Sequence, residues 1–319
     1  MAQFGYTLMG EQSGPRELVR DAVRAEAAGF DFAVSSDHYN PWSAAQGHSP
    51  YAWAVLGAVA ALTERMGLMS FVTCPTRRYH PAVVAQKAAT VGLMSNGRFT
   101  LGLGAGENLN EHVVGSWPHV RARHRMLTEA LQIIQALLTG QTLHYDGEYF
   151  EVPEAKLWDR PVQGVPIAVA VSGPDSARLA ATYGDAMIAT EAKAGLIREF
   201  EASGGVRRPR YGQVTLCYGE DEQACRRRVY EQQRWYGLGW PVNSELPDPE
   251  AFASASAAVT EDQLAEAIPC GPDVRRHADA VRRYVEAGFT HVAIVQAGGD
   301  HQEEFLDFAE KELLPALRS

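Results

Sequence analysis

Strand-like and helix-like segments alternate along almost the whole chain, and this alternation restricts the possible folds more than any other feature. Short apolar runs typical of buried strands are each followed by longer segments with helical character. The strands are expected at residues 4–8, 32–35, 67–74, 98–103, 166–171, 186–189, 213–217 and 292–296. Eight strands joined mainly by helices predict a (β/α)8 barrel, a TIM barrel of the α/β class, rather than an open sheet.

The segments between these strands predict one domain over residues 1–319 that carries two insertions. Helices are expected at 15–28, 52–65, 81–94, 121–138 and 302–317, with a mainly helical stretch at 220–287 that contains a loop at 240–249. One insertion, at 140–163, follows the fourth helix and is predicted to form a small hairpin around 145–150. The other follows the seventh strand.

Charge and composition exclude several classes of function. The net charge of −10 argues against general binding to nucleic acid or to anionic membranes, although it leaves small anionic ligands possible. No apolar run reaches the roughly 18 residues of a membrane span, and the N-terminal residues lack the pattern of a signal peptide. The four cysteines show no CxxC spacing. We therefore expect a cytoplasmic protein with reduced thiols and a small-molecule substrate.

The heptad from Ser36 to Trp42 follows the second predicted strand and places chemistry at a strand end. Asp37 and His38 would lie at the mouth of the barrel, where ligands bind in this architecture. A histidine at such a position can act as a general base, and Trp42 can stack on a flat ligand. The alternative interpretations are a hydrogen-bonded core histidine and a packing tryptophan.

A second motif, from Gly102 to Asn110, has the same form of strand, glycines and acid. Glycine lets the backbone approach a ligand closely, and Glu107 can exchange a proton there or simply lie near a helix N-terminus. Ser172 and Gly173 precede a predicted helix, and their backbone amides could form a phosphate cradle. The tripeptide Ser172-Gly173-Pro174 is, however, also a common turn sequence. Arg78 is interpreted as a solvated residue or a contact for an anionic tail. No metal site is predicted, since His112, His119 and His124 lack ligand spacing.

Together these motifs resemble the luciferase-like flavin and deazaflavin oxidoreductase superfamily. The branch that contains coenzyme F420-dependent glucose-6-phosphate dehydrogenases is the most similar. The matching text includes Glu11-Gln12, Ser36-Asp37-His38, Pro41-Trp42, Arg78-Tyr79, Gly102-Leu103-Gly104, Gly106-Glu107, Leu109-Asn110-Glu111 and Gly173-Pro174. The resemblance implies a luciferase-like TIM barrel, a homodimer and coenzyme F420 as the cofactor, with FMN as the alternative.

The resemblance also implies a role for individual residues. His38 would take the substrate's hydroxyl proton, Glu107 would handle a second proton, and Trp42 would position the reacting centre. The expected cofactor contacts are Asp37, Val72, Gly106, Asn110, Ser172 and Gly173, and a non-proline cis peptide is expected between Phe71 and Val72. Thr190 and Lys193 match one part of the family's substrate site, and Trp240, which departs from the family pattern, is expected to contact the substrate in a more apolar pocket.

One departure from the family pattern bears on the substrate. The family's other phosphate-binding cations would fall near Asn243 and Ala267, but residues 235–274 contain no lysine or arginine. A dianionic phosphate without paired cations would be held poorly, so glucose 6-phosphate is not the expected substrate. The sequence therefore predicts an F420-dependent oxidoreductase acting on a small alcohol or carbonyl compound. The alternatives are an FMN-dependent luciferase-like monooxygenase and a cofactor-carrying or sensing protein without turnover.

Overall fold

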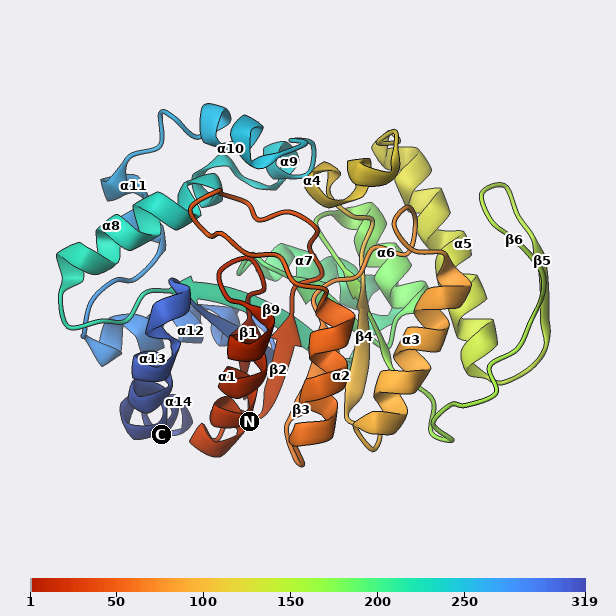
Figure 1. Cartoon of the computed structure of the whole chain (residues 1–319), viewed down its shortest axis with the longest axis horizontal. Coiled ribbons are helices and arrows are strands. Elements are labelled where there is room, and N and C mark those ends of the chain that lie inside the picture. The colour runs from red at the N-terminus through yellow and green to blue at the C-terminus, as the bar shows by residue number, and fades with distance from the viewer. Residues whose placement is uncertain (1) are drawn as a thin grey trace.

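The computed structural model describes residues 2–319 and contains a closed barrel of eight parallel strands (Figure 1). Around the barrel the order is β1, β10, β9, β8, β7, β4, β3 and β2. Their bounds are β1 Gln3–Leu8, β2 Phe32–Ser35, β3 Gly67–Ser70, β4 Phe99–Leu103, β7 Ile167–Ala170, β8 Ala186–Ala189, β9 Arg210–Leu216 and β10 His291–Gln296. The predicted (β/α)8 barrel is confirmed.

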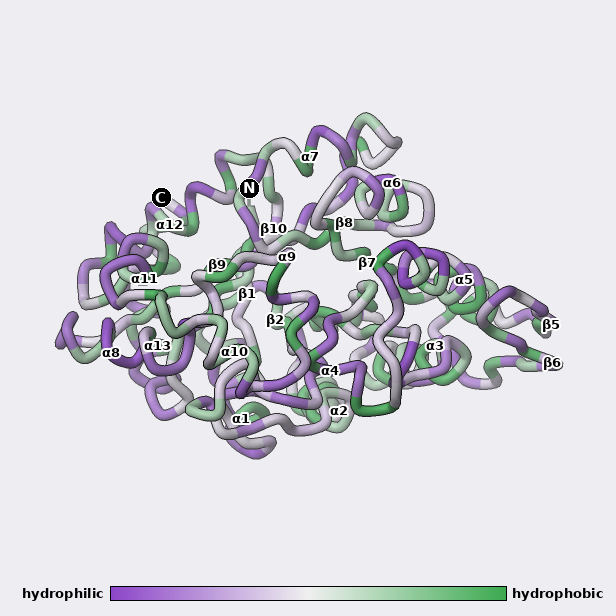
Figure 2. Tube along the Cα trace, turned by 90° about the horizontal axis from the view of Figure 1, so that it is seen from above, coloured by the Kyte–Doolittle hydropathy of each residue, from purple (hydrophilic) through white to green (hydrophobic). Residues whose placement is uncertain are grey.

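Helices surround the barrel and also extend above it (Figures 1 and 2). The outer helices are α1 Pro15–Ala28, α2 Ala52–Leu62, α3 Pro81–Met94, α5 Val120–Leu138, α6 Pro174–Tyr183, α7 Ala194–Phe200, α12 Val274–Ala287, α13 Gln302–Phe308 and α14 Leu314–Arg318. The segments above the barrel contain α4 Asn108–Glu111, α8 Glu222–Gln233, α9 Trp240–Asn243, α10 Pro249–Ala255 and α11 Glu261–Ala267. No helix among residues 2–319 has the length and apolarity that crossing a membrane requires.

Alternation along the strands divides the core into two parts, because successive strand side chains point to opposite faces. On β2, Ala33 belongs to the large cluster that packs against the helices, whereas Phe32 and Val34 belong to a smaller cluster of strand residues inside the barrel. Both clusters are buried, which explains why the strands read as continuous apolar runs.

Most predicted boundaries agree with the structure, and the differences have local causes. The predicted hairpin is present as β5 (Leu143–Asp146) and β6 (Glu151–Ala155). The predicted strand at 67–74 is too long, since after Ser70 only Thr73 pairs, in a single bridge to Leu103. The cis peptide expected between Phe71 and Val72 is present.

The prediction of a loop at 240–249 is wrong in part. Its beginning is the one-turn helix α9, which has Pro241 in its first turn, and its end is the start of α10. Asp248 caps α10 by accepting a 2.8 Å hydrogen bond from the backbone N–H of Ala251, and Pro249 follows it. An acceptor residue followed by proline is a helix-start signal. The sequence interpretation missed that signal.

Close approach of neighbouring strands predicts a strict requirement for glycine at position 102. A Cβ added to Gly102 would lie 1.9 Å from the carbonyl oxygen of Ser70 on β3. We expect Gly102→Ala to lower the free energy of unfolding by about 1–3 kcal/mol, measured by urea denaturation. In the control Gly57→Ala, on α2, the nearest atom is 3.9 Å away, so the change should be neutral or slightly stabilising. Equal stability of wild type and Gly102→Ala would contradict the strand spacing.

Candidate active site

The two sequence motifs meet at the mouth of the barrel, joined by a buried amide. Asn110 in α4 is 1% exposed, and its Oδ1 accepts hydrogen bonds from the backbone N–H groups of Tyr39 (2.8 Å) and Asn40 (3.3 Å). Asn40 returns a 2.9 Å bond from its side-chain amide to the carbonyl oxygen of Leu109. The loop after β2 is therefore fixed to the segment after β4, although β3 lies between these strands.

His38 is paired with a carboxylate that sequence reasoning had given no role. Its Nδ1 lies 2.9 Å from Oε1 of Glu11, whose side chain is 2% exposed. The other oxygen, Oε2, accepts a 2.6 Å hydrogen bond from the hydroxyl of Ser36, which itself accepts one from the backbone N–H of Gly10. Because Nδ1 faces Glu11, Nε2 is the ring nitrogen that does not take part in this pair.

The pairing changes the acid–base behaviour of both groups. Burial alone would lower the pKa of His38, but the charge and hydrogen bonding of Glu11 outweigh burial and raise that pKa from 6.5 to about 9. Burial alone would raise the pKa of Glu11, yet His38 keeps it below its usual value. Because the pKa of His38 is raised on folding, its protonation stabilises the folded protein. This stabilisation is complete below pH 6.5 and is lost as the pH rises through about 9.

Asp37, expected as a cofactor contact, lies at the centre of a buried hydrogen-bond network. It is 2% exposed. Its Oδ2 accepts bonds from Trp53 Nε1 (3.2 Å) and Thr73 Oγ1 (2.7 Å). Its Oδ1 accepts a 3.1 Å bond from the hydroxyl of Tyr79, and its backbone oxygen accepts a 2.6 Å bond from Arg78. Four neighbours therefore fix the residue that precedes His38.

Arg78 connects this network to the segment after β4, contrary to its interpretation as a solvated residue or a contact for an anionic tail. Its side chain is 8% exposed and forms ion pairs with Asp37 (3.5 Å) and Glu111 (2.8 Å). These carboxylates raise the pKa of the Arg78 guanidinium despite its burial. The sequence missed the role of Arg78 because the partner carboxylates are 41 and 33 residues away.

Trp42 forms part of an apolar roof beside His38. Its ring is stacked on Trp235 at 4.5 Å, meets Phe252 edge-on at 5.2 Å and lies 5.0 Å from the imidazole of His38. Trp42 is 7% exposed and also belongs to a cluster with Met9 and residues of β10 and the segment after β9. The structure thus gives Trp42 a packing contact and a position next to the histidine at the same time.

Glu107 lies at the start of α4 and is half-buried. The side-chain amide of Asn110 donates a 3.3 Å bond to its Oε2, and its charge contributes to the raised pKa of His38. The preceding Gly106 has φ +83°, and a Cβ there would lie 2.6 Å from Sγ of Cys74. Glycine is therefore required at position 106 by conformation and by space.

The predicted cofactor residues beyond β7 lie at the N-terminus of α6. The backbone N–H groups of Ser172 (3.0 Å) and Gly173 (3.1 Å) both donate to Oγ of Ser176, which was absent from the predicted site. A Cβ at Gly173 would meet nothing within 4 Å, so this glycine faces open space. Two strands away in the barrel order, after β3, Val72 is partly exposed and lies against Gly104.

The three predicted substrate residues are less closely connected to this centre. Thr190 is exposed, and its backbone oxygen accepts a bond from Tyr284. Lys193 has a side chain 62% exposed and is paired with Glu191 at 2.8 Å. Trp240 is half-buried at the beginning of α9, above the barrel mouth (Figure 2). Among residues 2–319, no group of three or more histidine, cysteine or acidic side chains could hold a metal ion.

A closed α/β barrel with titratable side chains on the loops after β2 and β4 is the architecture of a (β/α)8-barrel enzyme. The family described as luciferase-like monooxygenase matches residues 1–291, so the chain belongs to the luciferase-like family. The resemblance found in the sequence is thereby confirmed.

Several known proteins are similar to the chain over its full length. An F420-dependent glucose-6-phosphate dehydrogenase of Intrasporangium calvum is 35% identical, with 100% of this chain and 99% of that protein covered. One of Beutenbergia cavernae is 36% identical, with 100% and 98% covered. A solved F420-dependent secondary alcohol dehydrogenase, in complex with an F420-acetone adduct, is 29% identical with a TM-score of 0.90, covering 100% and 99% of the two chains. These relatives confirm the oxidoreductase class.

The Glu11–His38 pair predicts how activity depends on pH. In Glu11→Gln the carboxylate charge is lost, so the pKa of His38 should fall from about 9 toward 6.5 or lower. If neutral His38 takes the substrate proton, the acidic limb of kcat/KM for alcohol oxidation should move to lower pH by more than one unit. The matched control is Glu17→Gln, which changes an exposed carboxylate on α1. An unmoved limb in Glu11→Gln would contradict the assignment of that limb to His38.

Proposed function

We propose that the chain is a coenzyme F420-dependent oxidoreductase that interconverts a small alcohol and its carbonyl compound. The observation that carries this proposal is the buried Glu11–His38 pair beneath the apolar roof of Trp42. It supplies a proton-transfer group beside an apolar ring, which suits an uncharged carbon skeleton. The names of the full-length relatives support the deazaflavin cofactor.

The residues at the mouth fit a flat, anionic cofactor. Gly173 leaves open space at the N-terminus of α6, where a phosphate is favoured by the helix dipole. Ser172 would contribute there, and Val72, Gly106 and Asn110 would border the ring, whereas Asp37 would act mainly through the backbone it fixes. A bound deazaflavin supplies the two-electron hydride acceptor or donor of the reaction.

His38 would exchange the proton that accompanies hydride transfer. In the oxidising direction the substrate O–H bond breaks, Nε2 takes the proton, and Glu11 stabilises the resulting imidazolium at 2.9 Å. In the reducing direction the same imidazolium protonates the new alkoxide. The pKa of about 9 keeps His38 charged at neutral pH, which favours carbonyl reduction there and alcohol oxidation at higher pH. Glu107 is assigned the transfer of the second proton of the reaction. Trp42 is assigned the positioning of the reacting carbon.

The substrate is proposed to be small and uncharged. The apolar ring of Trp42 lies 5.0 Å from the imidazole of His38 and is packed against Trp235 and Phe252. Residues 235–274 contain no cation to pair with a phosphate, and Lys193 is already paired with Glu191. Although the curated relatives are named for glucose 6-phosphate, these features favour an alcohol of the kind named in the secondary alcohol dehydrogenase structure. Thr190, Lys193 and Trp240 remain candidates for contacts at the outer edge of the site.

The alternatives have less support. An FMN-dependent monooxygenase would share the family, but the solved monooxygenases that resemble this chain are at most 20% identical, which speaks to the fold alone. A carrier or sensor without turnover gives no reason for a buried carboxylate that raises the pKa of His38.

The proposal predicts cofactor preference and substrate preference in the same preparation. Anaerobic spectroscopic titration should show tighter binding of F420 than of FMN, and 2-propanol should reduce F420 whereas glucose 6-phosphate should not. His38→Ala should lower kcat by about 10²–10⁴-fold, because general acid–base catalysis is lost. Tight binding of FMN alone, or substrate-dependent oxygen uptake with reduced FMN, would favour the monooxygenase, and a silent His38→Ala would favour the carrier.

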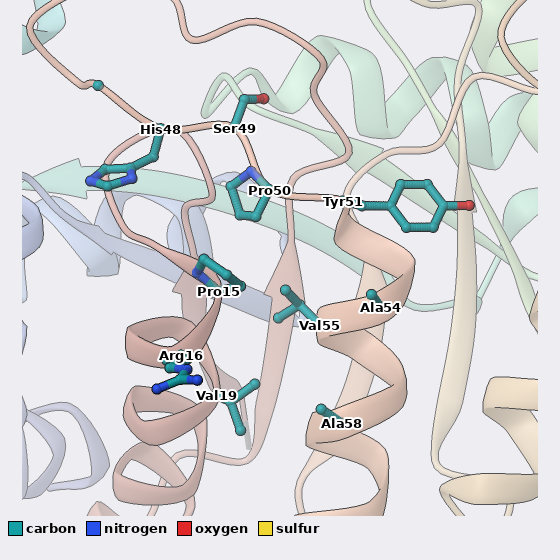
Figure 3. Close-up of a pocket in the computed structure, with 11 residues that line it drawn as sticks. Pro15, Arg16, Val19, His48, Ser49, Pro50, Tyr51, Ala54, Val55 and Ala58 are labelled. Carbon is teal, nitrogen blue, oxygen red and sulfur yellow. The ribbon is translucent and has the colours of Figure 1, made fainter.

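We also propose that the protein forms a homodimer through the outer face of α2 and α3. All 11 residues of α2 are apolar, a composition typical of a helix covered on every side. Yet five large apolar side chains on or beside α2 and α3 are each 43–59% exposed, namely Tyr51, Leu62, Val83, Leu93 and Met94. An apolar groove of about 800 Å³ lies between α1 and α2, bordered by Val19, Val55 and Ala58 (Figure 3). A second copy of the chain would cover both the exposed apolar side chains and the groove.

The dimer face predicts which substitutions produce monomers. Leu62→Glu combined with Met94→Glu places charges in the proposed interface and should convert a dimer to a 34.8 kDa monomer in sedimentation velocity at micromolar concentration. Val206→Glu is the control, since Val206 is 61% exposed and lies outside these helices. A monomeric wild type, or dissociation by the control substitution alone, would refute this interface.

A further inference from the structure

An arm projects from the barrel and is held in a fixed position by α5. The arm consists of the hairpin β5–β6 and the return segment 156–163, and it extends away from the barrel beside α5 (Figures 1 and 2). Glu129 of α5 accepts hydrogen bonds of 2.9–3.2 Å from the backbone N–H groups of residues 148–150 at the hairpin tip. An isolated two-stranded hairpin is only marginally stable in water, so these bonds to α5 fix the arm.

The base of the arm carries apolar side chains that nothing in this chain covers. Val162 is 94% exposed and Trp158 is 85% exposed, the two highest values for large apolar side chains among residues 2–319. The return segment lies against α3, since a Cβ added to Gly92 would be 2.9 Å from Cγ of Pro161. The exposed apolar surface of α3 therefore continues onto the arm, as expected for a surface that a partner covers.

The hairpin of the arm is acidic. Residues 143–155 contain four acids and no lysine or arginine. The ion pairs of this segment involve Glu148 and Glu154, so Asp146 and Glu151 have no cation partner in the part of the chain that the structure describes. Both side chains are exposed. A partner of the arm should therefore present basic side chains.

The groove between α1 and α2 has the complementary character. Its walls are mainly hydrocarbon, and its polar edge carries Arg16 and His48 (Figure 3). Arg16 is exposed, and no acid lines the groove with it. A groove with apolar walls and a basic edge matches an arm with an apolar base and an acidic hairpin.

The arm and the groove lie on opposite sides of the proposed dimer face. The helices follow one another around the barrel in the order α1, α2, α3 and α5, and the arm comes after α5 (Figure 2). In a two-fold dimer, a surface on one side of the axis contacts the surface on the other side of the axis in the partner copy. An axis parallel to the barrel axis, between α2 and α3, therefore brings each arm to the groove of the other copy.

The two surfaces also lie at the same level along the barrel. Arg16 belongs to the first turn of α1. The hairpin tip contacts Arg125 and Glu129 in the N-terminal half of α5. The outer helices of a β/α barrel begin at the end where the strands finish, so rotation about such an axis keeps the tip near the level of Arg16.

We propose that the β5–β6 arm of each copy binds in the groove between α1 and α2 of a second copy, with its acidic hairpin beside Arg16. This inference rests on the proposed homodimer and deepens it, because it names the element that each copy supplies to the other. The apolar base, with Trp158, supplies most of the affinity, whereas the contact between Asp146 and Arg16 fixes the register of the two copies.

Charge reversal tests the contact between the hairpin and Arg16. Arg16→Glu and Asp146→Arg should each raise the dimer dissociation constant about tenfold in sedimentation equilibrium, because like charges then meet at two equivalent contacts. The combination of both substitutions restores opposite charges and should return the constant to within about threefold of the wild type. The control Arg227→Glu reverses an exposed arginine on α8, outside the proposed contact, and should leave the constant unchanged.

Truncation of Trp158 tests the apolar part of the arm. Trp158→Ser should raise the same dissociation constant by at least about 30-fold, because tryptophans buried at an interface are typical energetic hot spots. The control Val206→Ser removes an apolar side chain that is 61% exposed and lies outside the arm, so it should have no effect.

Cross-linking gives a readout that does not depend on affinity. All four native cysteines are buried, so a flexible bis-maleimide should react with introduced thiols only. The double variant Arg16→Cys with Asp146→Cys should give a covalent dimer of twice 34.8 kDa. Either single variant should give far less, because its thiol then faces no thiol in the partner copy.

The outcomes separate the arm from the dimer itself. A monomeric wild type would contradict the proposed homodimer, and the arm contact with it. A dimer that Leu62→Glu with Met94→Glu dissociates, but that Arg16→Glu and Trp158→Ser leave intact, would keep the α2–α3 face and reject the arm. A dimeric double cysteine variant that does not cross-link would reject the arm equally.

Discussion

The ion pairs of Arg78 are the interaction on which the mouth of the barrel depends. Arg78 lies between β3 and α3, Asp37 follows β2, and Glu111 belongs to α4 after β4. One guanidinium therefore joins the loops of three neighbouring strands. All three side chains are buried, so each charge depends on the others for compensation. Because Asp37 directly precedes His38, the network also fixes the backbone that carries the proposed base.

The proposed acid–base pair is built separately, on the neighbouring side of the mouth. Glu11 comes from the loop after β1 and reaches His38 on the loop after β2. A fully buried carboxylate against the imidazole raises the pKa of His38, whereas burial alone would lower it. The result is a histidine suited to giving a proton at neutral pH and to taking one under alkaline conditions. Trp42 adds an apolar neighbour to this buried pair, 5.0 Å from the imidazole.

The segments after β4 and β9 form the remaining wall, and they are where this chain's own specificity is expected to lie. Glu245 clasps Arg123 and Trp117, while Asn108 bonds to the backbone of the segment that carries Asn243.

The sequence by itself determined the barrel, because apolar runs of strand length separated by helices have few other solutions. It also identified His38, Trp42 and Glu107 as neighbours at one mouth, since parallel strands bring their carboxyl ends to the same edge. Only the tertiary structure decided what these residues touch. Glu11, Arg78 and Glu111 acquire their partners through contacts between distant segments, and no local pattern marks a residue whose partner lies 27 to 41 positions away.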